Sequence, residues 1–155
     1  MCWARWSGWM ARKRSRARGW ALQVMYAWES RGERDRLPDL LREFIANRRI
    51  GAEAQDYLET LITTLDMYLE PVDEAVTASL LNWRLERLSI IDRSILRLAG
   101  AEMLHLAIPP RVVIQEAIEL AEKYGTNESP RFINGVLDAL MRRLELDTSR
   151  SGGKR

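Results

Sequence analysis

The sequence is poor in the residues that disulfides and metal centres require. It contains one cysteine, Cys2, and one histidine, His105. A single cysteine excludes an internal disulfide and a cysteine metal cluster. Because His105 has no second histidine and no suitable cysteine with which to hold a metal ion, we interpret it as a structural residue. We therefore expect no metal site and no cofactor.

Long apolar runs and glycine-rich loops are also missing. The apolar runs extend over only a few residues, which excludes a transmembrane helix and a membrane partner. The nine glycines include none in a phosphate-binding pattern of the GxxxxGK[ST] type. No serine or cysteine is paired with a general base, and Asp73 and Glu74 alternate with apolar positions as on a solvated helix surface. The sequence thus predicts a cytoplasmic protein that is not an enzyme.

Basic residues are concentrated at the two ends of the chain. Residues 1–20 hold six basic side chains and no acidic one, and residues 148–155 hold three more. The segment between them holds 15 basic and 22 acidic residues, a net charge of −7. A local basic cluster of this kind indicates a polyanionic partner better than the overall charge does.

Helical periodicity extends along most of the chain. Apolar residues recur at spacings of three and four, and on the first helix they form one stripe of Ala17, Trp20, Ala21, Val24 and Trp28. The helix expected up to about Leu106 is apolar on much of its circumference, which favours a central position. No convincing alternating strand pattern is present. Ser89 with Asp92 predicts an N-cap, as does Ser129 before a proline, and Gly125 suits a left-handed residue after a helix. Seven helices with short connections predict an all-α orthogonal bundle. Their expected starts are near Ala17, Leu37, Ala52, Pro71, Ile90, Pro110 and Pro130.

The segment RKRSRARGW, which begins at Arg12, is the strongest functional signal. At 3.6 residues per turn, Arg12 and Arg16 share one helix face, as do Arg14 and Arg18. Their charge opposes the dipole at a helix N-terminus, whereas guanidinium groups suit phosphate oxygens. The alternative is an arm that serves only solubility.

Two uncharged residues further along this helix suit RNA. Tyr26 lies two turns past Arg18, where its ring could stack on an unpaired base, and Gln23 could read a base edge. The alternative for Tyr26 is a half-buried packing residue. Near the other end of the chain, Phe132 follows Arg131 at the margin of the last apolar stripe.

The stretch NWRLERLSIIDRSILR places charged residues around apolar ones, as a protein interface does. Ordinary surface ion pairs are the alternative. The charged residues are Arg84, Glu86, Arg87, Asp92, Arg93 and Arg97.

Three collinear segments resemble the NusB family of bacterial transcription antitermination factors. ARKRSRARGWALQVMYAWE resembles the Arg-rich opening of that family, and NWRLERLSIIDRSILRLAGAEML resembles its central segment. IPPRVVIQEAIELAEKYGTNESPRFINGVLDAL is similar to its C-terminal signature, with Gln115 where asparagine is usual and Tyr124 where phenylalanine is usual. The resemblance covers roughly residues 10–146.

The resemblance implies an all-α fold of two small helical subdomains. It also implies binding of boxA-type single-stranded RNA together with a small-subunit ribosomal protein, known in this context as NusE. That pair would join other Nus factors on RNA polymerase and support antitermination of ribosomal RNA transcription.

The resemblance and the charge pattern together give two sets of site residues. We expect RNA binding by Arg12, Arg14, Arg16, Arg18, Gln23, Tyr26, Glu128, Arg131 and Phe132. The central segment matches the partner-binding side of the family, so we expect partner binding by Glu86, Asp92, Arg93 and Arg97.

Two features depart from the family pattern. Gly19 and Trp20 replace an acidic-aliphatic pair, and a glycine inside a helix costs about 1 kcal/mol against alanine. This predicts a first helix that is loosened at Gly19 or begins only after it. Met10 stands where family members tend to start, so we hypothesise that it is the natural start or that residues 1–9 are disordered.

The expected organisation has three parts: a flexible extension over 1–11, a NusB-like helical RNA-binding domain over 12–146 and a disordered basic tail over 147–155. Two alternatives remain. One is a helical adaptor for proteins, or a homo-oligomer such as a homodimer, without direct RNA contact. The other is a module related to the NusB-like part of RNA cytosine methyltransferases, whose long catalytic domain would have to follow Arg155.

Overall fold

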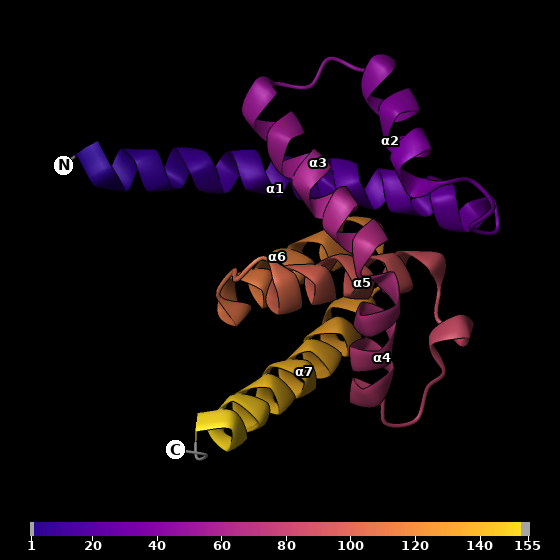
Figure 1. The fold of residues 1–155 in the computed structure, drawn as a ribbon, viewed down its shortest axis with the longest axis vertical. Coiled ribbons are helices and arrows are strands. Elements are labelled where there is room, and N and C mark those ends of the chain that lie inside the picture. Colours follow the sequence, from indigo (N-terminus) through magenta and orange to yellow (C-terminus); the bar gives the residue numbers. More distant parts are fainter. Residues whose placement is uncertain (1, 153–155) are drawn as a thin grey trace. The chain divides into compact units, whose positions relative to one another are not determined.

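The computed structural model describes the backbone of residues 2–152 and the side chains of residues 8–152. In that part of the chain, all regular structure is helical (Figure 1). The helices divide between two compact units, Met1–Met67 and Tyr68–Arg155, which confirms the predicted all-α fold in two small subdomains. Their bounds are α1 Cys2–Ser30, α2 Leu37–Ala46, α3 Ala52–Met67, α4 Leu69–Ser79, the 3₁₀ helix η1 Leu85–Arg87, α5 Ile90–His105, α6 Pro110–Tyr124 and α7 Ser129–Gly152.

The first unit consists of α1, α2 and α3, which pack against one another. α2 and α3 cross the later part of α1, whose first turns extend beyond them (Figure 1). The predicted apolar stripe of α1 faces the core: Ala17, Ala21 and Val24 are fully buried. Trp20 meets Phe44 of α2 edge-on, with 5.9 Å between the ring centroids. The apolar periodicity therefore predicted the buried side of α1 correctly.

α1 begins earlier than the sequence predicts. It starts at Cys2 and passes through Gly19 without a break, so a start near Ala17 or after Gly19 is wrong. A Cβ added at Gly19 would meet nothing within 4 Å. Most helical stability in proteins comes from packing of the apolar face rather than from propensity. Burial of neighbouring positions such as Ala17 and Ala21 thus outweighs the cost of one glycine.

A left-handed turn ends α1. Gly32 has a φ of 71°, and its N–H donates to the carbonyl of Glu29 at 3.0 Å. The N–H of Glu33 donates to the carbonyl of Trp28 at 3.0 Å. The indole Nε1 of Trp28 donates in turn to the carbonyl of Asp35 at 2.9 Å. The last residue of the apolar stripe therefore also fixes the connection to α2.

In the second unit α5 is the central helix, as its apolar circumference predicts. α4, α6 and α7 all pack on it. Ser89 caps its first turn, because its Oγ accepts a hydrogen bond from the N–H of Asp92 at 3.1 Å. Gly100 allows α4 to approach closely: a Cβ there would lie 3.0 Å from Cγ1 of Val72 and 3.3 Å from Cγ2 of Val76.

The connection between α6 and α7 differs from the prediction in two details. Gly125 has a φ of −89°, so it is not a left-handed cap. Glycine is required there by space, since a Cβ would lie 2.6 Å from Cβ of Ser129 and 2.8 Å from the carbonyl oxygen of Ala121. Ser129 is the first residue of α7 rather than its N-cap. Its Oγ accepts a hydrogen bond from the N–H of Thr126 at 3.0 Å, which closes the tight turn.

The first and last helices, α1 and α7, extend into the two terminal segments that we expect to be flexible. Residues 2–11 belong to α1 and residues 147–152 to α7. Met1 and residues 153–155 lie outside the described part of the chain. The flexibility of both ends, the domain limits and Met10 as a natural start stay predictions. None of the helices described has an apolar stretch long enough to cross a membrane.

Candidate nucleic-acid interface

One side of α1 remains open to solvent and carries four of the predicted RNA-binding residues. Arg12, Arg16, Gly19, Gln23 and Tyr26 follow one another at spacings of three and four, which keeps them within about 40° of a common line on the helix. Arg12, Arg16 and Gln23 are exposed, and Tyr26 is 47% exposed. At 1.5 Å per residue this stripe is about 21 Å long. We call these five residues the α1 face.

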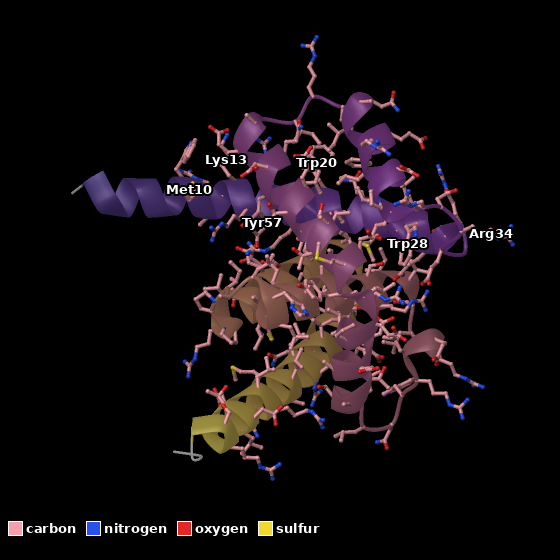
Figure 2. All side chains as sticks on the ribbon, viewed as in Figure 1. Met10, Lys13, Trp20, Trp28, Arg34 and Tyr57 are labelled. Carbon is pink, nitrogen blue, oxygen red and sulfur yellow. The ribbon has the colours of Figure 1, made fainter. Side chains whose placement is uncertain are left out.

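Arg14 and Arg18 lie on another side of α1 and contact Tyr57 of α3, which is labelled in Figure 2. Their guanidinium carbons lie 5.2 and 5.5 Å from the centroid of the Tyr57 ring, which are cation–π distances. Arg18 is only 3% exposed. The structure thus separates the predicted arginines: Arg12 and Arg16 face solvent, whereas Arg14 and Arg18 pack α1 against α3.

A cavity of about 390 Å³ lies beside the α1 face, between α1 and α2. Gln23 and Tyr26 line it from α1, Phe44 lines it from α2, and Asn47 and Arg48 line it from the residues directly after α2. The guanidinium carbon of Arg48 lies 3.8 Å from the centroid of the Phe44 ring. Phe44, Asn47 and Arg48 are not among the site residues that the sequence predicts. The two consecutive arginines after the α2 apolar face were the available signal.

In the second unit, residues from both predicted sets come together on one surface. A cavity of about 180 Å³ is lined by Asp92 from the partner set, by Glu128 and Phe132 from the RNA set, and by Trp83. Trp83 and Phe132 meet edge-on, with 6.2 Å between their ring centroids. Both rings also line a neighbouring cavity of about 320 Å³, which Arg131 borders. Phe132, from the RNA set, therefore lies beside Asp92, from the partner set.

Two exposed apolar residues beside this surface were missed by sequence analysis. Leu81 and Trp83, in the connection between α4 and η1, are 91% and 61% exposed. Large apolar side chains gathered in the open mark interaction surfaces in soluble proteins. The available signal was a tryptophan inside a short connection that periodicity could not assign to any helix. We call Leu81, Trp83 and Phe132 the apolar patch.

The other predicted partner-binding residues differ in how far they are engaged within the second unit. Arg97 is 5% exposed and forms a bidentate pair with Asp73 of α4, with Nε–Oδ1 and Nη2–Oδ2 distances of 2.8 and 2.9 Å. Asp73 is therefore not the solvated carboxylate that the sequence predicts. Arg93 Nη1 donates to three carbonyl groups of η1 and its flank at 3.3 to 3.5 Å. Glu86 is exposed, and Asp92 is half-buried at the edge of the smaller cavity.

The lone histidine packs against an aromatic ring. The imidazole of His105 stacks on Tyr68, with ring centroids 3.9 Å apart and planes 10° apart. The part of the chain that the structure describes holds no group of three or more His, Cys, Asp and Glu side chains arranged for a metal ion.

Known proteins share both the sequence and the fold of this chain. A model described as the NusB family matches residues 15–142. The transcription antitermination protein NusB of Anaeromyxobacter dehalogenans is 42% identical over 130 residues, which cover 83% of this chain and 90% of that protein. The structure of T. maritima NusB is similar with a TM-score of 0.76 and 35% identity, covering 83% of this chain and 90% of that one. A structure of antitermination factors NusB and NusE in complex with dsRNA has a TM-score of 0.75 and 30% identity, covering 85% of this chain and 98% of the matched one.

The fold and the site define a class: a small all-helical protein whose first helix presents a basic, aromatic face. The NusB family model matches most of the length of this chain, so the chain belongs to the NusB family. The resemblance inferred from the three sequence segments is thereby confirmed. The relative from A. dehalogenans is named for transcription antitermination, which agrees with the prediction that the chain is not an enzyme.

Proposed function

We propose that this member of the NusB family is a cytoplasmic transcription antitermination factor. It binds boxA-type single-stranded RNA in ribosomal RNA leader transcripts together with the ribosomal protein NusE. The pair then joins other Nus factors in the antitermination complex on RNA polymerase. The observation that carries the proposal is the α1 face, an exposed stripe of arginines, an amide and an aromatic ring on one helix of a NusB-family fold.

The chemistry of the α1 face favours single-stranded RNA. Arg12 and Arg16 are exposed guanidinium groups that suit phosphate oxygens along a nucleic-acid backbone. The half-exposed ring of Tyr26 offers a surface on which an unpaired base stacks. A base within a duplex is already stacked on both sides, so Tyr26 would contribute little there. The similar structure with dsRNA makes the comparison of the two RNA forms part of the test.

The apolar patch is the proposed docking site for NusE. Trp83 and Phe132 form a paired aromatic centre, and Glu128 and Arg131 lie beside the same cavities. An aromatic centre with a polar rim is the usual composition of a protein interface. Asp92, which lines the smaller cavity, extends this rim. The exposed Glu86 of η1 stays a proposed partner-binding residue. In this proposal Arg93 and Arg97 stabilise the conformation of this surface through their contacts within the second unit.

The experiment measures binding of a labelled boxA-type single-stranded RNA, with and without NusE, across a salt series. Arg12→Ala/Arg16→Ala should weaken binding and make its salt dependence shallower, by about 0.7 in the log–log slope for each phosphate that the variant no longer neutralises. Tyr26→Ala should weaken binding of single-stranded RNA by about 1–3 kcal/mol and affect duplex RNA less.

Arg111→Ala is the matched control, because it removes one exposed charge from α6, outside the α1 face. It should leave both the affinity and the salt slope close to those of the wild type. An Arg12→Ala/Arg16→Ala variant that binds RNA like the wild type would refute the assignment of the α1 face. Arg18→Ala is unsuitable for this test, since Arg18 is buried and its replacement would disturb packing.

A second candidate function rests on the apolar patch alone. The exposure of Leu81 and Trp83 also suits a protein-binding adaptor or a homodimer that makes no RNA contact. Sedimentation of the wild type and of Trp83→Ser separates these cases, since a homodimer built on the patch would dissociate in the variant. The alternative of a methyltransferase-related module has no support in the relatives described above, which are named as antitermination factors.

A further inference from the structure

We propose that the cavity between α1 and α2 holds one unpaired base of the bound RNA. Gln23 and Asn47 contact the polar edge of that base, Tyr26 stacks on its face, and Arg48 contacts its phosphate. The inference rests on the proposed function and deepens it, because it adds a site that recognises a base to the α1 face, where Arg12 and Arg16 contact the RNA backbone.

The cavity has a suitable size and position. Its volume of about 390 Å³ falls within the range of about 300–1,000 Å³ for small-molecule sites. It opens directly beside the α1 face, because Gln23 and Tyr26 belong to both. An RNA strand lying along Arg12 and Arg16 can therefore place one base in the cavity without leaving the helix.

The polar groups of the cavity are arranged for an external partner. Gln23 is exposed, and no described residue hydrogen-bonds its side-chain amide, which leaves a donor and an acceptor side by side. Asn47 donates from Nδ2 to the carbonyl of Glu43 at 3.0 Å. This bond fixes the orientation of the Asn47 side chain and leaves Oδ1 as an acceptor. Side-chain amides contact base edges in this manner in nucleic-acid complexes.

The two arginines of the cavity differ in their partners. Arg31 Nη1 lies 3.1 Å from Oδ2 of Asp35 and 3.9 Å from Oε2 of Glu43, so carboxylates already balance its charge. Arg48 instead contacts the Phe44 ring, at 3.8 Å from the guanidinium carbon to the centroid. A guanidinium that contacts the face of an aromatic ring keeps its positive charge and its N–H donors for another ligand. Arg48 therefore suits the phosphate next to the captured base.

The test is an abasic scan, in which each nucleotide of a boxA-type single-stranded RNA in turn loses its base and keeps its phosphate. With the wild type, at least one position should lose roughly 5- to 150-fold in affinity, as expected for one stacked base. In Gln23→Ala/Asn47→Ala the penalty at one such position should be smaller than in the wild type, because the base loses its edge contacts and keeps only its stacking on Tyr26. Penalties at the other positions should stay as they are in the wild type.

Two controls distinguish this base site from the phosphate contacts of the α1 face. Arg12→Ala should weaken every RNA of the scan by a similar factor, since a phosphate contact is indifferent to the base. Gln115→Ala, an exposed helical glutamine of α6, should change none of them. Thermal unfolding of each variant verifies folding. If the double variant is destabilised, Tyr26→Ala provides a second variant at the cavity, because it removes the ring on which the base stacks.

The outcomes distinguish this inference from the proposed function. If the wild type binds RNA but the abasic profile is the same in the cavity variants, the base site is wrong and the RNA-binding function stands. If the wild type binds no single-stranded RNA, alone or with NusE, the proposed function and the base site fall together. A penalty that falls in the cavity variants at one position of the RNA, and at no other, supports the site.

Discussion

The same substitution at two glycines is expected to have different effects on stability. Gly19 and Gly100 both lie inside helices, in α1 and α5. A Cβ at Gly19 would meet nothing within 4 Å, whereas at Gly100 it would lie 3.0 Å from Cγ1 of Val72 and 3.3 Å from Cγ2 of Val76. Gly19→Ala and Gly100→Ala therefore share the change in helix propensity and differ only in packing.

The expected magnitudes follow from these distances. Replacing a helical glycine by alanine raises the free energy of unfolding by about 1 kcal/mol where space is open, which is the expectation for Gly19→Ala. At Gly100 the new methyl group is too close to two β-branched side chains whose rotamers are stiff. Overpacking of a core costs about 1–3 kcal/mol, so Gly100→Ala should be less stable than Gly19→Ala by about that amount.

Urea unfolding, followed by circular dichroism, measures the difference. The transition midpoint should rise for Gly19→Ala and should be lower for Gly100→Ala than for Gly19→Ala, with unchanged slopes for both. A Gly100→Ala protein as stable as Gly19→Ala would refute the reasoning, because it would mean that α4 moves away from α5 at no cost.

Three further predictions follow from other contacts. Asp73→Ala should lower the free energy of unfolding by about 2–3 kcal/mol, because it removes the carboxylate that forms a bidentate pair with the buried guanidinium of Arg97. An unchanged urea midpoint would contradict this. Ser89→Ala removes the N-cap of α5 and should cost about 1 kcal/mol, measured in the same way. Trp83→Ala should weaken NusE binding by at least about 2 kcal/mol in calorimetric titration, as expected for an interface anchor. It should change the stability of the protein little, because the Trp83 side chain is 61% exposed. Equal affinity of the variant and the wild type would place the NusE interface elsewhere.

Local sequence signals were reliable where one residue's chemistry decides the structure. The hydroxyl of Ser89 predicts a cap and makes one. The apolar stripe of α1 predicts which residues are buried, because a helix with one apolar side has one way to bury it. The same reasoning failed at Gly125, where the backbone is extended and the requirement for glycine comes from a residue four positions later, Ser129.

By itself, the sequence determined that the chain is helical, that α1 has one apolar side and one basic side, and that the chain resembles the NusB family. Periodicity and motif order are properties of the chain alone. Only the tertiary structure decided which charges remain available to a ligand. Arg14 and Arg16 look equivalent in sequence, yet packing of α3 places Tyr57 beside Arg14 and leaves Arg16 in solvent. Contacts between segments distant in sequence make that distinction, and no local pattern contains them.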